Sequence, residues 1–137
     1  MKFLADVNVL SEPTKPQADV RVVQWLMANH AEIAVDPIVM GEMWEGIAAL
    51  PDGRRKENLA AWFRRSPSSL VCLDWTLKTA IVWAELRDDV RRRGFTVPVK
   101  DTLIAATAKL HGLTVATRNV EDFQRCGVPV VNPFESE

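Results

Sequence analysis

The sequence alternates short apolar runs with longer amphipathic segments, and this alternation restricts the possible folds more than any other feature. The short runs predict strands buried on both faces; they cover residues 2–5, 33–35, 70–73, 113–117 and 128–131. The longer segments carry apolar residues at helical spacing; they cover residues 19–29, 38–50, 54–65, 75–93 and part of 98–111. Strands that alternate with helices predict a parallel sheet with helices on both faces, which is an α/β fold.

The 137 residues suit one domain, and 47% apolar residues are enough for one buried core. The chain shows no internal repeat, low-complexity tract or linker, so residues 1–137 are predicted to form a single domain. No apolar run approaches the roughly 18 residues that a membrane span needs. Asp6 and Glu12 interrupt the N-terminal segment, unlike a signal peptide. We therefore expect a cytoplasmic protein with no membrane partner.

The charges nearly cancel, because 17 Lys and Arg stand against 18 Asp and Glu, for a net charge of −1. This balance excludes a strongly basic coat of the kind that binds nucleic acid throughout. Basic residues do cluster at 54–56, 64–65 and 91–93. Solvated helix faces explain such clusters as well as RNA binding does.

Several kinds of catalytic site are excluded by what the sequence lacks. His30 and His111 do not have the spacing of a zinc site. Cys72 and Cys126 form no CxxC pair, and both are expected to be buried thiols. The chain has no GxSxG elbow, phosphate-binding GxxxxGK[ST] loop or GxGxxG motif. Serine hydrolysis, P-loop chemistry and dinucleotide binding therefore lack their residues.

Four acids instead follow predicted strands or begin predicted helices. Asp6 ends the first apolar run, with Asn8 on the same side if the chain is still extended there. Glu42 lies early in the helix after the second run, and Asp101 begins the helix within 98–111. Asp122 comes shortly after the run at 113–117. Because ligand sites of parallel sheets lie at the carboxyl ends of the strands, we expect these acids to converge.

Each acid also has a purely structural interpretation. Asp101 suits a helix cap, Glu42 a solvated helix face, and Asp122 a turn. Asp6 is harder to explain in this way, since an acid at the end of a buried strand needs a partner. If the four gather, they repel one another and their pKa values rise unless a cation lies among them. Such carboxylates suit Mg²⁺ or Mn²⁺, which commonly serve phosphodiester hydrolysis.

Four segments together resemble the PIN-domain family, and in particular the FitB-like branch of the VapC-type toxins. They are LADVNVLSE, VMGEMWEGI, VKDTLIAATAKLHGLTVATRNVEDF and VPVVNPFE, and the likeness covers essentially the whole chain. The long segment is the specific signal. The resemblance implies a three-layer α/β/α PIN-like domain with a central parallel sheet.

The resemblance also implies an activity and a site. It implies a metal-dependent endoribonuclease that acts as the toxin of a type II toxin–antitoxin pair. Residues Asp6, Asp101 and Asp122 would hold Mg²⁺ or Mn²⁺, and Glu42 would bind the metal or a water molecule on it. Supporting residues of the pocket would be Asn8, Thr117 and Asn119. A homodimer is implied, as is a cognate antitoxin that binds the toxin and carries the DNA-binding part of the complex.

Two positions depart from the family pattern. Val7 stands where a threonine is common, so a hydroxyl that would orient the ligands is missing. Lys100 precedes Asp101 where a small residue is typical, and its ammonium group could pair with the acids or with substrate phosphate. These departures keep open a catalytically weak module that only binds RNA or a partner. A Mg²⁺-dependent phosphatase or receiver-type domain is less well supported, because Asn8 replaces its second acid.

Overall fold

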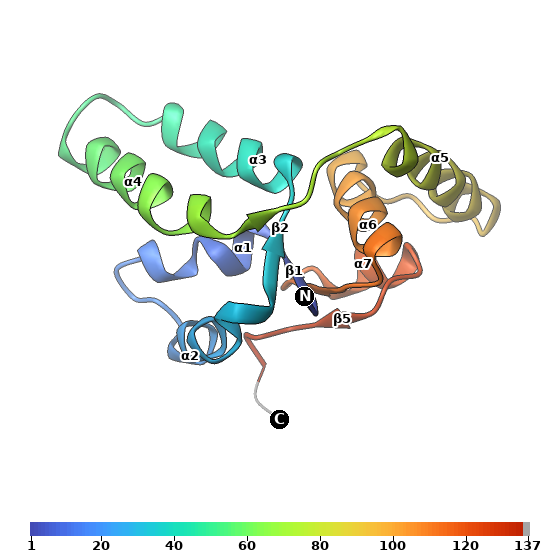
Figure 1. The fold of residues 1–137 in the computed structure, drawn as a ribbon, viewed down its shortest axis with the longest axis horizontal. Helices are drawn as coiled ribbons and strands as arrows, with labels where there is room; N and C mark the ends of the chain where they lie inside the picture. The colour runs from blue at the N-terminus through green and yellow to red at the C-terminus, as the bar shows by residue number, and fades with distance from the viewer. Residues whose placement is uncertain (136–137) are drawn as a thin grey trace.

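The computed structural model describes residues 1–135. Within them, parallel strands form one five-stranded sheet in the order β3-β2-β1-β4-β5 (Figure 1). The strands are β1 (Phe3–Ala5), β2 (Ile33–Val35), β3 (Val71–Cys72), β4 (Thr114–Ala116) and β5 (Val130–Val131). Each lies within a run predicted to be a strand, so the predicted α/β fold with a parallel sheet is confirmed.

The α-helices of the described chain cover both sides of this sheet. They are α1 (Val7–Leu10), α2 (Val20–Asn29), α3 (Pro37–Ala48), α4 (Arg54–Arg65), α5 (Leu77–Arg92), α6 (Val99–His111) and α7 (Val120–Arg125). Figure 1 shows α1 to α4 on one side of the sheet and α5 to α7 on the other. The strand order explains this, because right-handed connections reverse their face when the chain returns from β3 to β4. The result is the expected three-layer arrangement.

The main core includes the sheet and the helices packed on its two faces, α1 and α3 on one and α5 and α6 on the other. Its largest fully buried side chains include Leu4, Ile33, Ile104 and Phe123. Gly112 ends α6 with a φ of 66°, a left-handed conformation that glycine adopts without steric cost. In the described part of the chain, no helix combines the length and the apolar character needed to cross a membrane.

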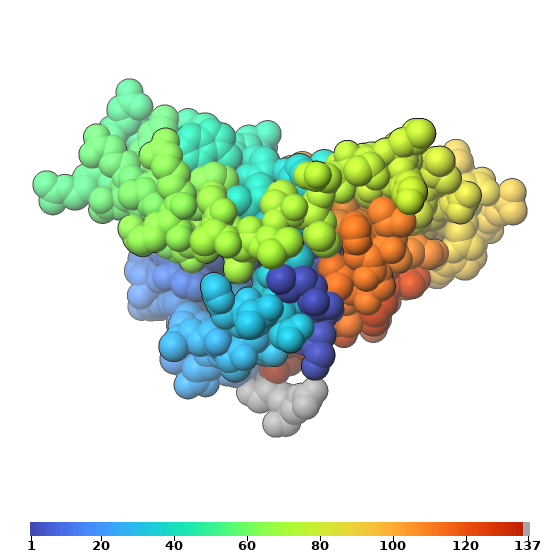
Figure 2. Space-filling view, in the orientation of Figure 1, coloured from blue at the N-terminus to red at the C-terminus, as the bar shows by residue number. Residues whose placement is uncertain are grey.

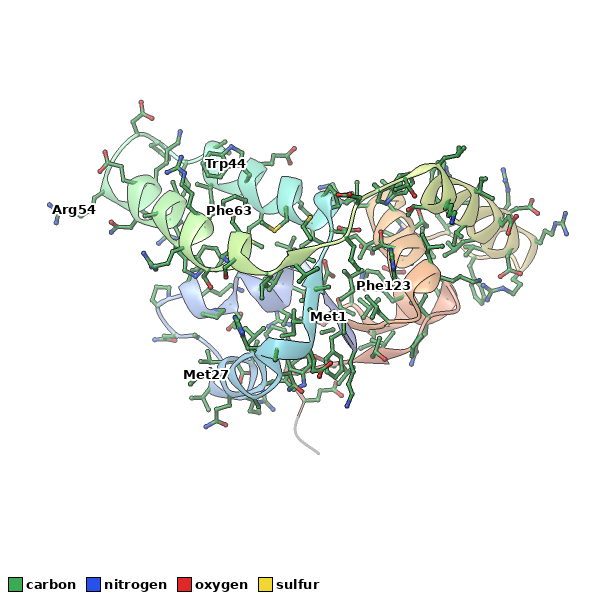
Figure 3. The ribbon with its side chains drawn as sticks, in the orientation of Figure 1. Met1, Met27, Trp44, Arg54, Phe63 and Phe123 are labelled. Atoms are coloured by element: carbon green, nitrogen blue, oxygen red, sulfur yellow. The ribbon has the colours of Figure 1, made fainter. Side chains whose placement is uncertain are left out.

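Helices α3 and α4 form a separate projection on one side of the molecule. The rings of Trp44 and Phe63 pack between them, with centroids 5.2 Å apart (Figure 3). Figure 2 shows that the outline is indented between this projection and the lobe formed by α5 and α6. The acids Glu42 and Asp101 belong to α3 and α6, the helices that contribute to the two sides.

Two expectations are corrected by the structure. The chain is not extended after Asp6, because the Asp6 carboxylate accepts the Val7 N–H at 2.8 Å and starts α1 at once. Cys72 is exposed, whereas Cys126 is buried as expected. The reason is that Cys72 lies in β3, a two-residue strand at the edge of the sheet whose residues are both exposed.

Candidate functional site

Strand register brings three polar residues to one level at the carboxyl edge of the sheet. Leu4 is level with Ala34, and Ala5 is level with Ala116. The first residue after the end of each of these three strands is polar, and the three residues are Asp6, Asp36 and Thr117. All three are buried, so each needs a hydrogen-bond partner within the protein.

Asp6 is only 6% exposed, and the groups that donate hydrogen bonds to its carboxylate are neutral. One carboxylate oxygen caps α1, and the other accepts the Thr117 hydroxyl at 2.8 Å and the Asn8 side-chain amide at 3.3 Å. Burial raises the pKa of Asp6, and these hydrogen bonds oppose the rise. The carboxylate therefore lies desolvated at the edge of the sheet with neutral donors around it.

Thr117 is the centre of a small polar network. Its hydroxyl accepts the Asn8 side-chain amide at 3.3 Å and the Asn119 backbone N–H at 2.9 Å. Asn8 in turn accepts the Arg118 backbone N–H at 3.0 Å through its side-chain oxygen. Asn8, Thr117 and Asn119 thus lie beside Asp6 and link α1 to the turn between β4 and α7.

Asn119 connects the two remaining aspartates. Its Nδ2 donates to Asp101 Oδ2 at 2.7 Å and to Asp122 Oδ2 at 2.9 Å. Asp101 lies in the first turn of α6, and Asp122 lies in the first turn of α7 instead of in a loop. Burial first, and then the negative charges of Asp6, Asp122 and Glu42, raise the pKa of Asp101 to about 6, while the hydrogen bond from Asn119 opposes the rise. The four predicted acids therefore share one electrostatic environment.

Glu42 reaches this environment from α3, on the opposite helix layer. Its carboxylate is partly buried and lies 3.8 Å from the ammonium group of Lys100. Burial raises the pKa of Glu42, Lys100 opposes the rise, and the charge of Asp6 adds to it. Lys100 thus places a positive charge beside the acids, where it partly offsets their mutual repulsion.

The donor set fits a hard divalent cation in its chemistry. Carboxylate oxygens suit Mg²⁺ or Mn²⁺, and the mutual repulsion recorded at Asp101 is what a cation relieves. As placed, however, no three His, Cys, Asp or Glu side chains of residues 1–135 are arranged to hold a metal ion. The amide of Asn119 occupies an oxygen of both Asp101 and Asp122. A cation would therefore need these side chains to move closer together.

Asp36 is a buried acid that the sequence interpretation overlooked. It is fully buried directly after β2, where it caps α3 by accepting the Val39 N–H at 2.9 Å. The signal was present, because Asp36 follows the apolar run IAV as Asp6 follows FLA. Both of its oxygens are hydrogen-bonded inside the protein, as those of Asp6 are, but Asp36 is fully buried whereas Asp6 keeps 6% of its surface exposed.

Comparisons with known proteins show what the whole chain is similar to. The chain matches the PIN domain family model over residues 3–128. It is 36% identical over 136 residues to Toxin FitB of Neisseria gonorrhoeae, covering 96% of this chain and 98% of that protein. It is 32% identical over 143 residues to VapC ribonuclease Y4jK of Sinorhizobium fredii, covering 97% and 98% of the two chains. A structure of FitAB bound to an IR36 DNA fragment superposes with a TM-score of 0.93 at 35% identity, covering 98% and 97%.

Proposed function

Because this chain belongs to the PIN-domain family, we propose that it is a metal-dependent endoribonuclease and the toxin of a type II toxin–antitoxin pair. Its relatives include one protein named as a toxin and another named as a ribonuclease, each matched over nearly its full length. The proposal combines the two names, since it describes a toxin that acts as a ribonuclease. We further propose that the substrate of the protein is RNA and that the protein acts in the cytoplasm.

The gathering of the acids at the carboxyl edge of the sheet is the observation that carries the proposal: Asn119 joins Asp101 to Asp122, and the charges of Asp6 and Glu42 act on Asp101. These acids come from four different elements of the chain, and burial makes their repulsion strong. A protein gains little stability from such an arrangement, since paired negative charges without a cation oppose folding. Binding of a divalent cation would relieve this repulsion, and it would explain why the acids lie together.

Asp6, Asp101 and Asp122 are the residues that would hold Mg²⁺ or Mn²⁺, with Glu42 at the side of the pocket formed by α3. When bound, the cation supplies the Lewis acid that hydrolysis of an RNA phosphodiester needs. Thr117 fixes the Asp6 carboxylate by its 2.8 Å hydrogen bond, and Asn8 supports Thr117. Asn119 positions Asp101 and Asp122 relative to each other through one amide.

The partners follow from the same family membership. We propose a cognate antitoxin as the protein partner, as in the FitAB complex, and a homodimer as the state of the toxin itself. DNA would be bound only indirectly, through the antitoxin.

Cleavage of RNA by the purified chain tests this function. A mixture of total RNA and tRNA is incubated with Mg²⁺, with Mn²⁺ or with EDTA, using wild type, Asp6→Asn and Asp101→Asn. We expect cleavage only with a divalent cation and only by wild type, while Asp6→Asn stays folded because asparagine also caps helices. Asp19→Asn is the matched control, since Asp19 caps α2 by accepting the Arg21 N–H at 2.9 Å. Cleavage that persists in EDTA or in Asp6→Asn contradicts the proposal.

A second candidate is a module that binds RNA or a partner but cleaves weakly. Two observations favour it: the Lys100 ammonium group already lies 3.8 Å from Glu42, and the acids as placed do not form a metal-binding set. The same experiment separates the two functions. A folded wild type that binds RNA in a filter or gel-shift assay, but neither cleaves it nor is stabilised by Mn²⁺, is the result expected of the binding module.

A further inference from the structure

The fully buried Asp36 joins two helices that carry residues of the acidic pocket. Its Oδ1 accepts the Val39 N–H of α3 at 2.9 Å, and its Oδ2 accepts the Thr107 hydroxyl of α6 at 2.9 Å. Thr107 is itself fully buried. A carboxylate in this position is costly, and burial together with the charge of Asp6 raises the pKa of Asp36. A neutral serine cap would avoid this cost, so the carboxylate calls for another explanation.

Helices α3 and α6 pack against each other in the same apolar core, and Asp36 adds a polar connection between them. A second polar connection is the ion pair of Glu42 with Lys100. Asp36 precedes Glu42 by six positions, and Thr107 follows Lys100 by seven positions. At 1.5 Å per residue, the two connections therefore lie about 9 Å apart along α3 and about 10 Å apart along α6. Two polar contacts at this spacing constrain both the distance between the helices and their crossing angle.

We infer that Asp36 is a positioning residue for the acidic pocket, because through Thr107 it sets the place of Glu42 relative to Asp101. The inference rests on the proposed function, in which these two acids surround a cation. The pair of Glu42 with the exposed Lys100, at 3.8 Å, is too weak to define this geometry alone, since ion pairs open to solvent contribute little. The buried hydrogen bond of Asp36 with Thr107 defines it instead.

Valine and serine at position 107 separate the hydrogen bond from the packing. Thr107→Val keeps the shape of the side chain but removes the donor, which leaves Asp36 Oδ2 buried without its partner. Thr107→Ser keeps the donor and removes a methyl group. Asp36→Asn is a milder change, because its amide can donate to the Thr107 hydroxyl while its oxygen still caps α3.

The matched control is Thr79→Val. Thr79 is also fully buried and also uses its hydroxyl, which accepts the Thr76 backbone N–H at 3.1 Å at the start of α5. It makes no contribution to the junction of α3 and α6 in this network. The same substitution thus removes a buried hydroxyl at a site outside the proposed positioning contact.

The experiment measures Mn²⁺ affinity by titration calorimetry and the melting temperature with and without Mn²⁺. We expect Thr107→Val to weaken Mn²⁺ binding about tenfold, as loss of a group that orients metal ligands does. The single variants Thr107→Ser and Asp36→Asn should each retain most of the Mn²⁺ affinity of wild type. Thr79→Val should lower the melting temperature while leaving Mn²⁺ affinity as in wild type.

The outcomes distinguish this inference from the function on which it rests. If wild type binds Mn²⁺ and Thr107→Val binds it equally well, Asp36 only stabilises the fold and the positioning role is wrong. A Thr107→Ser variant as weak as Thr107→Val also overturns it, because packing would then be the cause. If wild type itself binds no Mn²⁺, the metal-dependent function and the positioning role both fail.

Discussion

Asn119 donates its side-chain amide to Asp101 at 2.7 Å, so a neutral donor contacts the acid whose pKa is raised to about 6. An amide hydrogen carries only a partial positive charge, and it offsets the repulsion among the carboxylates incompletely. The pKa of Asp101 therefore depends on the charges of the other acids in the pocket. The titration of Asp101 and its response to a cation lead to the first two predictions.

Asp101→Asn should stabilise the metal-free protein at neutral pH. Because the folded-state pKa of Asp101 lies above the ordinary aspartate value of 3.8, ionisation of Asp101 costs the folded state more than the unfolded chain. The cost is absent below pH 4, grows as the pH rises toward 6 and is complete above it. We expect the variant to gain about 1–2 kcal/mol in free energy of unfolding at pH 7.5, allowing for solvent screening, and almost nothing at pH 4.

Urea denaturation in EDTA across this pH range measures the effect. Asp52→Asn is the control, because the Asp52 side chain is fully exposed on the loop before α4. A gain for Asp101→Asn that is equal at pH 4 and pH 7.5 contradicts the assignment of a raised pKa.

Mn²⁺ should raise the melting temperature of wild type, and EDTA should reverse the rise. A ligand that binds only the folded state stabilises it by about 2.7 kcal/mol at a concentration one hundred times its dissociation constant. Asp6→Asn and Asp101→Asn should lose most of this shift, whereas the Asp19→Asn control should keep it. Differential scanning fluorimetry at several Mn²⁺ concentrations measures it, and an equal shift in all four proteins would show that the ion binds elsewhere.

Lys100→Ala should tighten the binding of the divalent cation. The Lys100 ammonium group lies 3.8 Å from Glu42 and competes for the same negative charge, so its removal should lower the half-saturating Mn²⁺ concentration about two- to fivefold. Lys109→Ala, an exposed lysine in the last turn of the same helix, serves as the control. If Lys100→Ala instead raises the KM for RNA with no change in Mn²⁺ dependence, Lys100 contacts the substrate.

The two cysteines should react at very different rates with a thiol reagent. Cys72 is exposed on β3, while burial first, and then the charges of Asp101 and Asp122, raise the pKa of Cys126 to about 11. In the folded protein we expect one reacting thiol, lost in Cys72→Ser, and two after unfolding in guanidinium. Absorbance during reaction with Ellman's reagent counts them. Fast reaction of two thiols in the native state would be incompatible with the buried position of Cys126.

The regular elements with strong patterns could be predicted from the sequence, down to identical bounds for α4 and β2. Helix α1 could not, because four residues are too few to show a helical period, and its start depends on the cap provided by Asp6. The exposure of Cys72 also escaped prediction. Apolar neighbours in the sequence do not reveal that a strand lies at the edge of the sheet.

For the site, the sequence and the family likeness together indicated which acids to consider, but not how they are held. The double contact of Asn119 depends on the turn between β4 and α7, which no periodic pattern specifies. Asp36 was missed although its position repeats that of Asp6 on the neighbouring strand. Which of two such acids faces the pocket is decided by the partners that each finds in the fold, here Thr117 for one and Thr107 for the other.

The central position of β1, between β2 and β4, also bears on when the pocket can form during synthesis. Asp6 leaves the ribosome more than 100 residues before Thr117, Asn119 and Asp122. A nascent chain that stops before β4 has β2 but not β4 beside β1, and it lacks Asp122 and the Thr117 hydroxyl that donates to Asp6. The acidic pocket therefore stays incomplete until β4 and the turn that follows it have been made.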